Sequence, residues 1–128
     1  MAILALLLCL LLTSCGGGAS SPTTPTTPVN PNTFTITSAG VNPKDMTVAP
    51  GSQVRFVNSD SRPHNMTSDP HPDHQDCPEI NVVGLLQPGQ SDETGNLVMV
   101  QTCGFHEHDN PPPTTQAGNL WTGRISIR

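Results

Sequence analysis

The sequence predicts an all-β domain built as a β-sandwich, and three observations lead to that fold class. Short stretches of alternating apolar and polar residues, rich in β-branched side chains, recur at even spacing along the chain. Fourteen prolines are spread through the 128 residues, and proline interrupts helices. No apolar pattern with helical spacing persists for three turns.

Six stretches are predicted as strands because they combine apolar residues with β-branched side chains and are bounded by turn residues. They are residues 34–37, 46–48, 53–58, 80–86, 97–103 and 121–127. Pro50-Gly51 and residues 87–90 form the clearest turns. Met46 and Met99 lie on these stretches and are interpreted as core residues.

Two long segments between the predicted strands, residues 59–79 and 104–120, carry most of the reactive chemistry. All five histidines lie in them, namely His64, His71, His74, His106 and His108. Long loops inside a small compact domain are often functional. The clustering of imidazoles therefore predicts a metal site in these loops.

The N-terminal region predicts export and lipid anchoring. Residues 2–12 are almost wholly apolar, too few to span a bilayer but suited to an export signal. Leu12-Thr13-Ser14-Cys15 resembles a bacterial lipobox, which implies a lipoprotein signal peptide over residues 1–14 and a lipid on Cys15. We expect the protein to be anchored to a bacterial membrane and to face the periplasm or the cell exterior.

Composition sets the remaining domain boundaries and excludes several functions. Residues 15–32 are Gly, Ser, Thr, Pro and Asn with little else, which predicts a flexible linker before a folded domain at 33–128. The net charge is −5 and the five basic residues are scattered singly, so nucleic acid is not an expected partner. Neither a nucleophile-base motif nor a phosphate loop is present, and we expect no enzyme activity.

Several pieces of the chain follow one another in a recognisable order. Residues 41–58 contain the Pro50-Gly51 turn, and Pro63-His64-Asn65 comes next. The turn at 86–90, Cys103-Gly104-Phe105-His106 and residues 123–127 complete the series. This order resembles the plastocyanin/azurin family of cupredoxins over residues 34–128.

The resemblance implies an eight-stranded Greek-key sandwich with one copper ion held by His64, Cys103 and His106. It also implies a monomer that carries single electrons between redox proteins outside the cytoplasm. A thiolate with two imidazoles suits copper, although zinc can occupy a His/Cys cluster of this kind.

Two departures from the family leave alternatives open. Where the family has an axial Met, this chain has Leu120-Trp121-Thr122-Gly123, so His108 or Met66 is the candidate axial or fourth ligand. His71 and His74 are candidates for a second site or for completing the first, or they form part of an exposed polar loop. Carboxylates of Asp69, Asp73 and Asp76 are suitably placed in sequence to orient imidazoles.

The second departure is Cys77. With Cys15 lipidated, Cys77 and Cys103 are the thiols left in an oxidising compartment, where they can pair. A Cys77–Cys103 disulfide would remove the thiolate, and the protein would then capture or buffer copper through histidines alone. A sandwich that binds no metal and serves as an interaction module is the third alternative.

Overall fold

The structure is a computed structural model that describes residues 30–109 and 120–128. The predicted signal peptide, Cys15 and most of the predicted linker lie outside the described residues. Within the described ranges, no helix is both long and apolar enough to span a bilayer.

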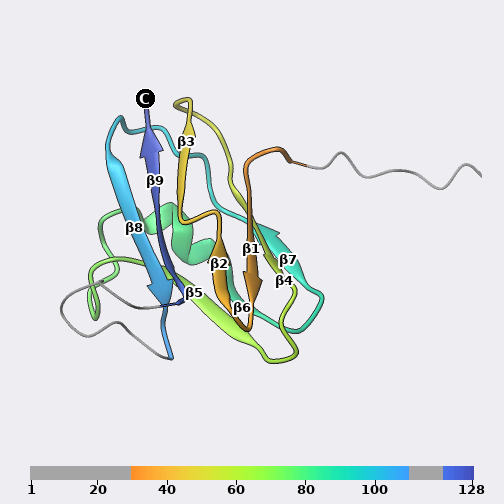
Figure 1. The fold of residues 1–128 in the computed structure, drawn as a ribbon. Coiled ribbons are helices and arrows are strands. Elements are labelled where there is room, and N and C mark those ends of the chain that lie inside the picture. Colours follow the sequence, from red (N-terminus) through yellow and green to blue (C-terminus); the bar gives the residue numbers. More distant parts are fainter. Residues whose placement is uncertain (1–29, 110–119) are drawn as a thin grey trace, which may run out of the picture.

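The described residues form two sheets that pack face to face (Figure 1). The first sheet has the order β2-β1-β4-β7, with bounds Gly40–Asn42, Thr33–Thr37, Arg55–Asn58 and Ser91–Glu93. The second has the order β3-β9-β8-β5-β6, with bounds Asp45–Val48, Thr122–Ile127, Thr102–Glu107, His64–Ser68 and Gly84–Leu86. A short 3-10 helix, η1 (Pro78–Val82), precedes β6. The predicted all-β sandwich is confirmed.

Three phenylalanines join the two layers. Phe34 on β1 and Phe56 on β4 belong to one sheet, and Phe105 on β8 belongs to the other. Their ring centroids lie 4.8 to 5.2 Å apart, and all three side chains are fully buried. Tilted and edge-on ring contacts of this kind add to the burial of apolar surface. The aromatic centre of the core therefore rests on these three rings.

Two polar strands differ from the sequence expectation. Residues 64–68 and 104–107 are expected in loops, yet they form β5 and the second half of β8. Both strands lie inside the second sheet, where paired neighbours satisfy their backbone groups, so their polar side chains do not prevent strand formation.

The apolar runs form shorter strands than the sequence predicts. The expected strand at 80–86 divides into η1 and β6, and the expected strand at 97–103 begins only at Thr102. Met99, interpreted as a core residue, is instead 64% exposed in the loop before β8, so that interpretation is wrong. An apolar run alone does not distinguish a buried strand from an exposed loop.

Candidate metal centre

The alternation of side chains along β8 separates Cys103 from His106. Successive residues of a strand face opposite sides of the sheet, so Cys103 shares the inner face with Phe105 and Glu107. His106 lies on the outer face, opposite Thr67 of β5. Two residues three positions apart in one extended strand do not reach a common ion, so the structure does not assemble Cys103 and His106 as joint ligands.

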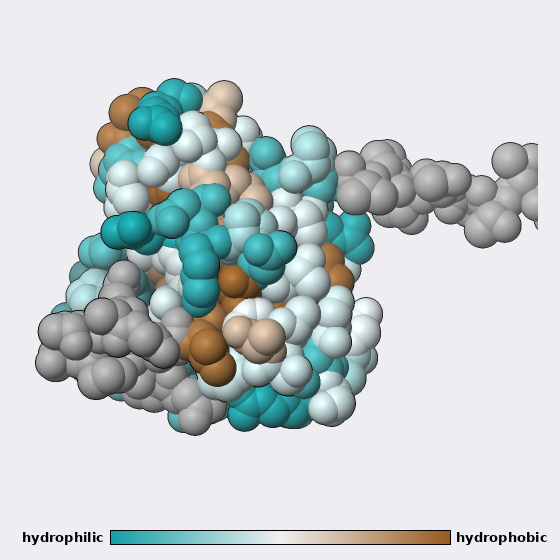
Figure 2. All heavy atoms as spheres, viewed as in Figure 1, coloured by the Kyte–Doolittle hydropathy of each residue, from teal (hydrophilic) through white to brown (hydrophobic). Residues whose placement is uncertain are grey.

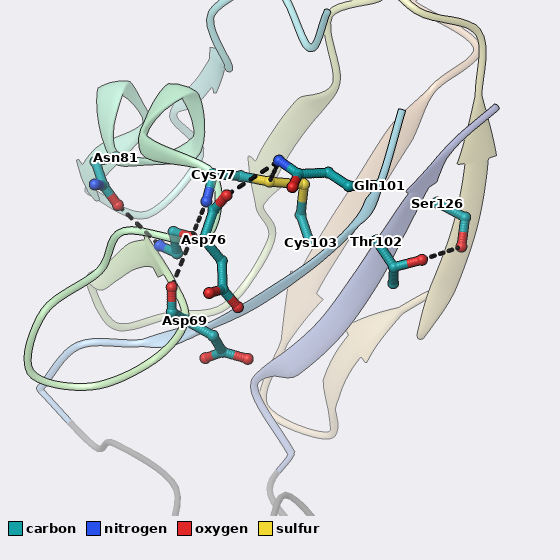
Figure 3. Close-up of a disulfide and its surroundings, with 9 residues drawn as sticks. Asp69, Asp76, Cys77, Asn81, Gln101, Thr102, Cys103 and Ser126 are labelled. Carbon is teal, nitrogen blue, oxygen red and sulfur yellow. Dashed lines mark hydrogen bonds between the residues drawn. A yellow bond between two sulfur atoms is a disulfide. The ribbon is translucent and has the colours of Figure 1, made fainter. Parts of the chain in front are cut away.

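Cys103 is also covalently occupied, because its sulfur forms a disulfide with Cys77 (Figure 3). The two Cα atoms lie 5.7 Å apart, and both side chains are buried. A disulfide sulfur carries no thiolate lone pair of the kind that a blue-copper site needs. The expected thiolate ligand is corrected accordingly, and the geometry matches the alternative with a Cys77–Cys103 bond.

His64, the other expected ligand, lies in a buried cluster of charged groups on the inner face. Its Nε2 is 3.0 Å from Asp60 Oδ2, and its Nδ1 is 3.3 Å from Glu107 Oε1. Arg62 approaches the same two carboxylates at 3.4 and 3.7 Å and places its guanidinium 4.3 Å from the Trp121 ring centre. The hydrogen bond with His64 holds the pKa of Asp60 below its usual range. His64 thus lies against two carboxylates that Arg62 also approaches, and it is not among the histidines that converge on the outer face.

Met66, considered as an axial ligand, is a fully buried core residue. It pairs with Glu107 across β5 and β8, and its thioether faces the interior of the sandwich. Met66 therefore packs in the core of the sandwich. It does not lie on the outer face of the sheet, where His106 lies.

Four histidines from two segments do converge on the outer face of the second sheet. They are His71, His74, His106 and His108, and one ring nitrogen of each lies within 4.8 Å of the others. His74 Nε2 is 3.3 Å from His71 Nδ1 and 3.4 Å from His108 Nδ1. Separations of this size are those of ligands held about 2.0 to 2.1 Å from one tetrahedral ion. The described residues therefore contain a group of imidazoles that can hold a metal ion.

The buried member of this four-histidine group is His106. Its Nδ1 lies 2.5 Å from Asp69 Oδ1, and a carboxylate can only accept, so Nδ1 carries the proton. Its Nε2 is buried and has no hydrogen-bond partner among the described residues. A carboxylate on one nitrogen, with the other nitrogen left for the ion, is the usual arrangement of a metal-bound histidine. Asp69, expected to orient an imidazole, lies where that role requires.

Gly104 allows Asp69 to lie directly against β8. The Asp69 N–H donates to the Gly104 carbonyl at 3.0 Å, which lays the loop directly across β8. A Cβ on residue 104 would lie 2.8 Å from Asp69 Cγ and closer still to Oδ2. The glycine of the Cys-x-x-His motif is thus needed for the approach of a carboxylate, a role that the sequence does not reveal.

The loop that carries His71 and His74 is held by its own hydrogen bonds. His74 N–H donates to Pro70 O at 2.7 Å, and Asp76 N–H donates to Asp69 O at 2.9 Å. The Asn81 amide donates to the His74 carbonyl at 2.9 Å, while His74 adopts the left-handed conformation with φ of 53°. The disulfide then fixes the end of the loop to β8 (Figure 3). The backbone that carries two of the histidines is thereby positioned against the strand that carries the others.

Electrostatics favours the neutral form of His74. Burial lowers the pKa of His74, and the neighbouring rings of His106, His108 and His71 lower it further. Only the neutral ring has a lone pair for a metal, so this shift leaves His74 ready to act as a ligand at neutral pH.

Comparison with known proteins supports the fold. No protein-family model matches the chain, and no curated protein matches its sequence. Among solved structures, it is similar to a purple cupredoxin from Nitrosopumilus maritimus, with 16% identity, a TM-score of 0.56, and coverage of 75% of this chain and 98% of that one.

Two further structures give the same result. The oxidised plastocyanin of Dryopteris crassirhizoma has 17% identity and a TM-score of 0.52, over 75% of this chain and 99% of that one. A Cu(I) form of a mutant amicyanin has 14% identity and a TM-score of 0.52, over 75% of this chain and 80% of that one. At these identities the similarity defines the fold, and the chain is cupredoxin-like in its fold, as the motifs predicted.

Proposed function

We propose that this protein captures and buffers Cu(II) outside the cytoplasm through His71, His74, His106 and His108, tethered to a membrane by a lipid on Cys15. The observation that carries the proposal is the buried Nε2 of His106, which has no hydrogen-bond partner in ranges 30–109 and 120–128, while the opposite ring nitrogen contacts Asp69. A buried polar atom without a hydrogen-bond partner is costly, and a bound metal removes that cost.

Copper is the metal that the ligand set favours. Hard cations such as Mg²⁺ and Ca²⁺ prefer oxygen ligands, whereas imidazole suits copper, zinc and nickel. Among divalent ions of the first transition row, Cu(II) binds nitrogen sites most tightly. The similar amicyanin structure is a Cu(I) form, which is in keeping with copper on this fold.

Capture accounts for the site better than fast electron transfer does. The fold alone suggests copper-binding electron transfer between redox partners, which is the second candidate function. Rapid transfer in blue-copper sites uses a thiolate ligand, and here Cys103 is bonded to Cys77. His71 is exposed and lies on a loop, which offers an entry path for an ion arriving from solvent.

The test is a Cu(II) titration of the purified, oxidised, full mature chain, followed by absorption and electron paramagnetic resonance spectroscopy. We expect one equivalent to bind, nitrogen hyperfine structure in the resonance spectrum, and no intense thiolate-to-copper band near 450 or 600 nm, the approximate positions for thiolate sites. An intense band at either position would refute the nitrogen-only site and support the electron-transfer alternative. Competition with Zn(II) tests the choice of metal.

Two matched variants locate the site. His106→Gln and His64→Gln each replace a fully buried histidine that contacts a carboxylate, so they perturb the fold in comparable ways. Loss of a ligand should lower copper affinity at least about 100-fold in His106→Gln, whereas His64→Gln should bind copper as the parent does. Equal loss in both variants, or loss in His64→Gln alone, would contradict the assignment.

A further inference from the structure

An exposed apolar tip lies at the end of the sandwich away from the histidines. Val98, Met99 and Val100 are three consecutive apolar residues, exposed by 58%, 64% and 72%. They precede β8 at the end where that strand begins, which is the upper end in Figure 1. Figure 2 shows hydrophobic atoms at this upper end, next to hydrophilic ones. We call residues 98–100 the apolar tip. A contiguous exposed apolar segment marks an interaction site more often than single exposed residues do.

The backbone on both sides of the apolar tip is hydrogen-bonded to neighbouring segments. Leu97 is buried, and its N–H donates to Ser52 O at 2.9 Å. On the other side of the tip, Ile127 N–H donates to Gln101 O at 2.8 Å. The apolar side chains are therefore presented outward by a backbone that is hydrogen-bonded at both ends.

Charge is distributed unevenly around this end. Residues 47–52, 97–102 and 126–128 contain no acidic side chain, although the chain has ten. Arg128 lies among them and donates to Thr47 Oγ1 at 3.2 Å. An apolar tip beside a cation, on segments that carry no acidic side chain of their own, fits the interface of an anionic bilayer better than a basic or acidic protein surface.

The N-terminal end of the described domain enters at the same end of the sandwich, beside the neighbouring sheet. Asn30 donates from its amide to Gln53 O at 3.1 Å, and Arg55 N–H donates to Asn32 O at 2.8 Å. These contacts put the beginning of the domain beside Ser52, which pairs with Leu97. If Cys15 carries a lipid, the roughly fifteen residues up to Asn30 span about 45 Å when extended at about 3.1 Å per residue.

We infer that the apolar tip inserts into the interfacial region of a lipid bilayer. This contact orients the domain so that the four-histidine group faces away from the membrane. β8 runs from the tip toward His106, a path of roughly 20 Å at about 3.3 Å per residue. The inference does not depend on which metal the histidines hold.

The experiment uses the full lipidated chain in phosphatidylglycerol vesicles that contain brominated lipids, which quench nearby tryptophan. The native Trp121 lies at the histidine end of β9 and serves as an internal reference. In Met99→Trp we expect added emission that is blue-shifted and quenched by the brominated lipids, while Trp121 in the parent is not quenched. Unquenched emission from the introduced tryptophan would overturn the inference.

A charge placed at the tip provides the control. Val98→Asp and Val82→Asp introduce the same change at similarly exposed valines, one in the tip and one in η1. In the Met99→Trp background, Val98→Asp should reduce lipid quenching several-fold and Val82→Asp should leave it unchanged. Equal reductions would refute insertion of the tip. If the emission of the introduced tryptophan depends on protein concentration and not on lipid, a second copy of the chain replaces the bilayer as the partner.

Discussion

Replacing Gly104 by alanine tests whether the outer face of β8 must remain bare for Asp69. The added Cβ would lie 2.8 Å from Asp69 Cγ and 3.2 Å from its Cβ, inside normal contact distance. The Asp69 main chain is bonded to Gly104 O, so the carboxylate must swing away and lose its 2.5 Å contact with His106 Nδ1. We expect the free energy of unfolding to fall by about 1 to 3 kcal/mol and the copper affinity to fall about 10- to 100-fold.

The assays are urea unfolding of the metal-free chain and Cu(II) titration of the folded chain. Asp69→Ala supplies the control, because it removes the carboxylate that the new methyl group displaces. In that background most of the effect of Gly104→Ala should disappear, which a double-mutant cycle measures as a coupling energy. Fully additive effects, or a Gly104→Ala chain that equals the parent in both assays, would refute the argument.

Three further predictions concern stability. Serine in place of both Cys77 and Cys103 should lower the free energy of unfolding in urea by about 3 kcal/mol, since the disulfide spans a sequence separation of 26 residues; no change would mean that the bond is absent or unimportant. Because the hydrogen bond with His64 lowers the pKa of Asp60, its stabilising contribution is present above about pH 4 and is lost as pH falls through the folded-state pKa. The free energy of unfolding should therefore fall less steeply with acidification below about pH 4 in Asp60→Asn than in the parent chain. Because burial lowers the pKa of His74, the unfolded state binds more protons just below about pH 6.5, and the metal-free chain should gain stability as pH rises through that interval. His74→Gln should remove this slope, and an unchanged slope would assign it to another group.

Much of the fold follows from local pattern. The short β-branched stretches and the Pro50-Gly51 turn predict an all-β sandwich, and the order of motifs predicts the cupredoxin-like arrangement that the similar structures support. Strands β5 and β8 are harder to predict, because their polar residues resemble loop sequence until a partner strand satisfies the backbone.

Which histidines converge depends on information that sequence spacing does not contain. Cys103 and His106 are close along the chain, yet the extended form of β8 directs them to opposite faces. His71 and His106 are far apart along the chain, yet their ring centroids lie 5.7 Å apart. The same strand geometry separates His64 from the four-histidine group.

By itself, then, the sequence determined the class of fold, the presence of histidine-rich segments and the two sulfurs able to pair. The tertiary structure decided which imidazoles come together, that Cys77 bonds to Cys103, and that Gly104 makes room for Asp69. The physical reason is that local pattern governs whether a segment forms a strand, while sheet pairing and strand direction govern which face each side chain occupies and which distant residues it meets.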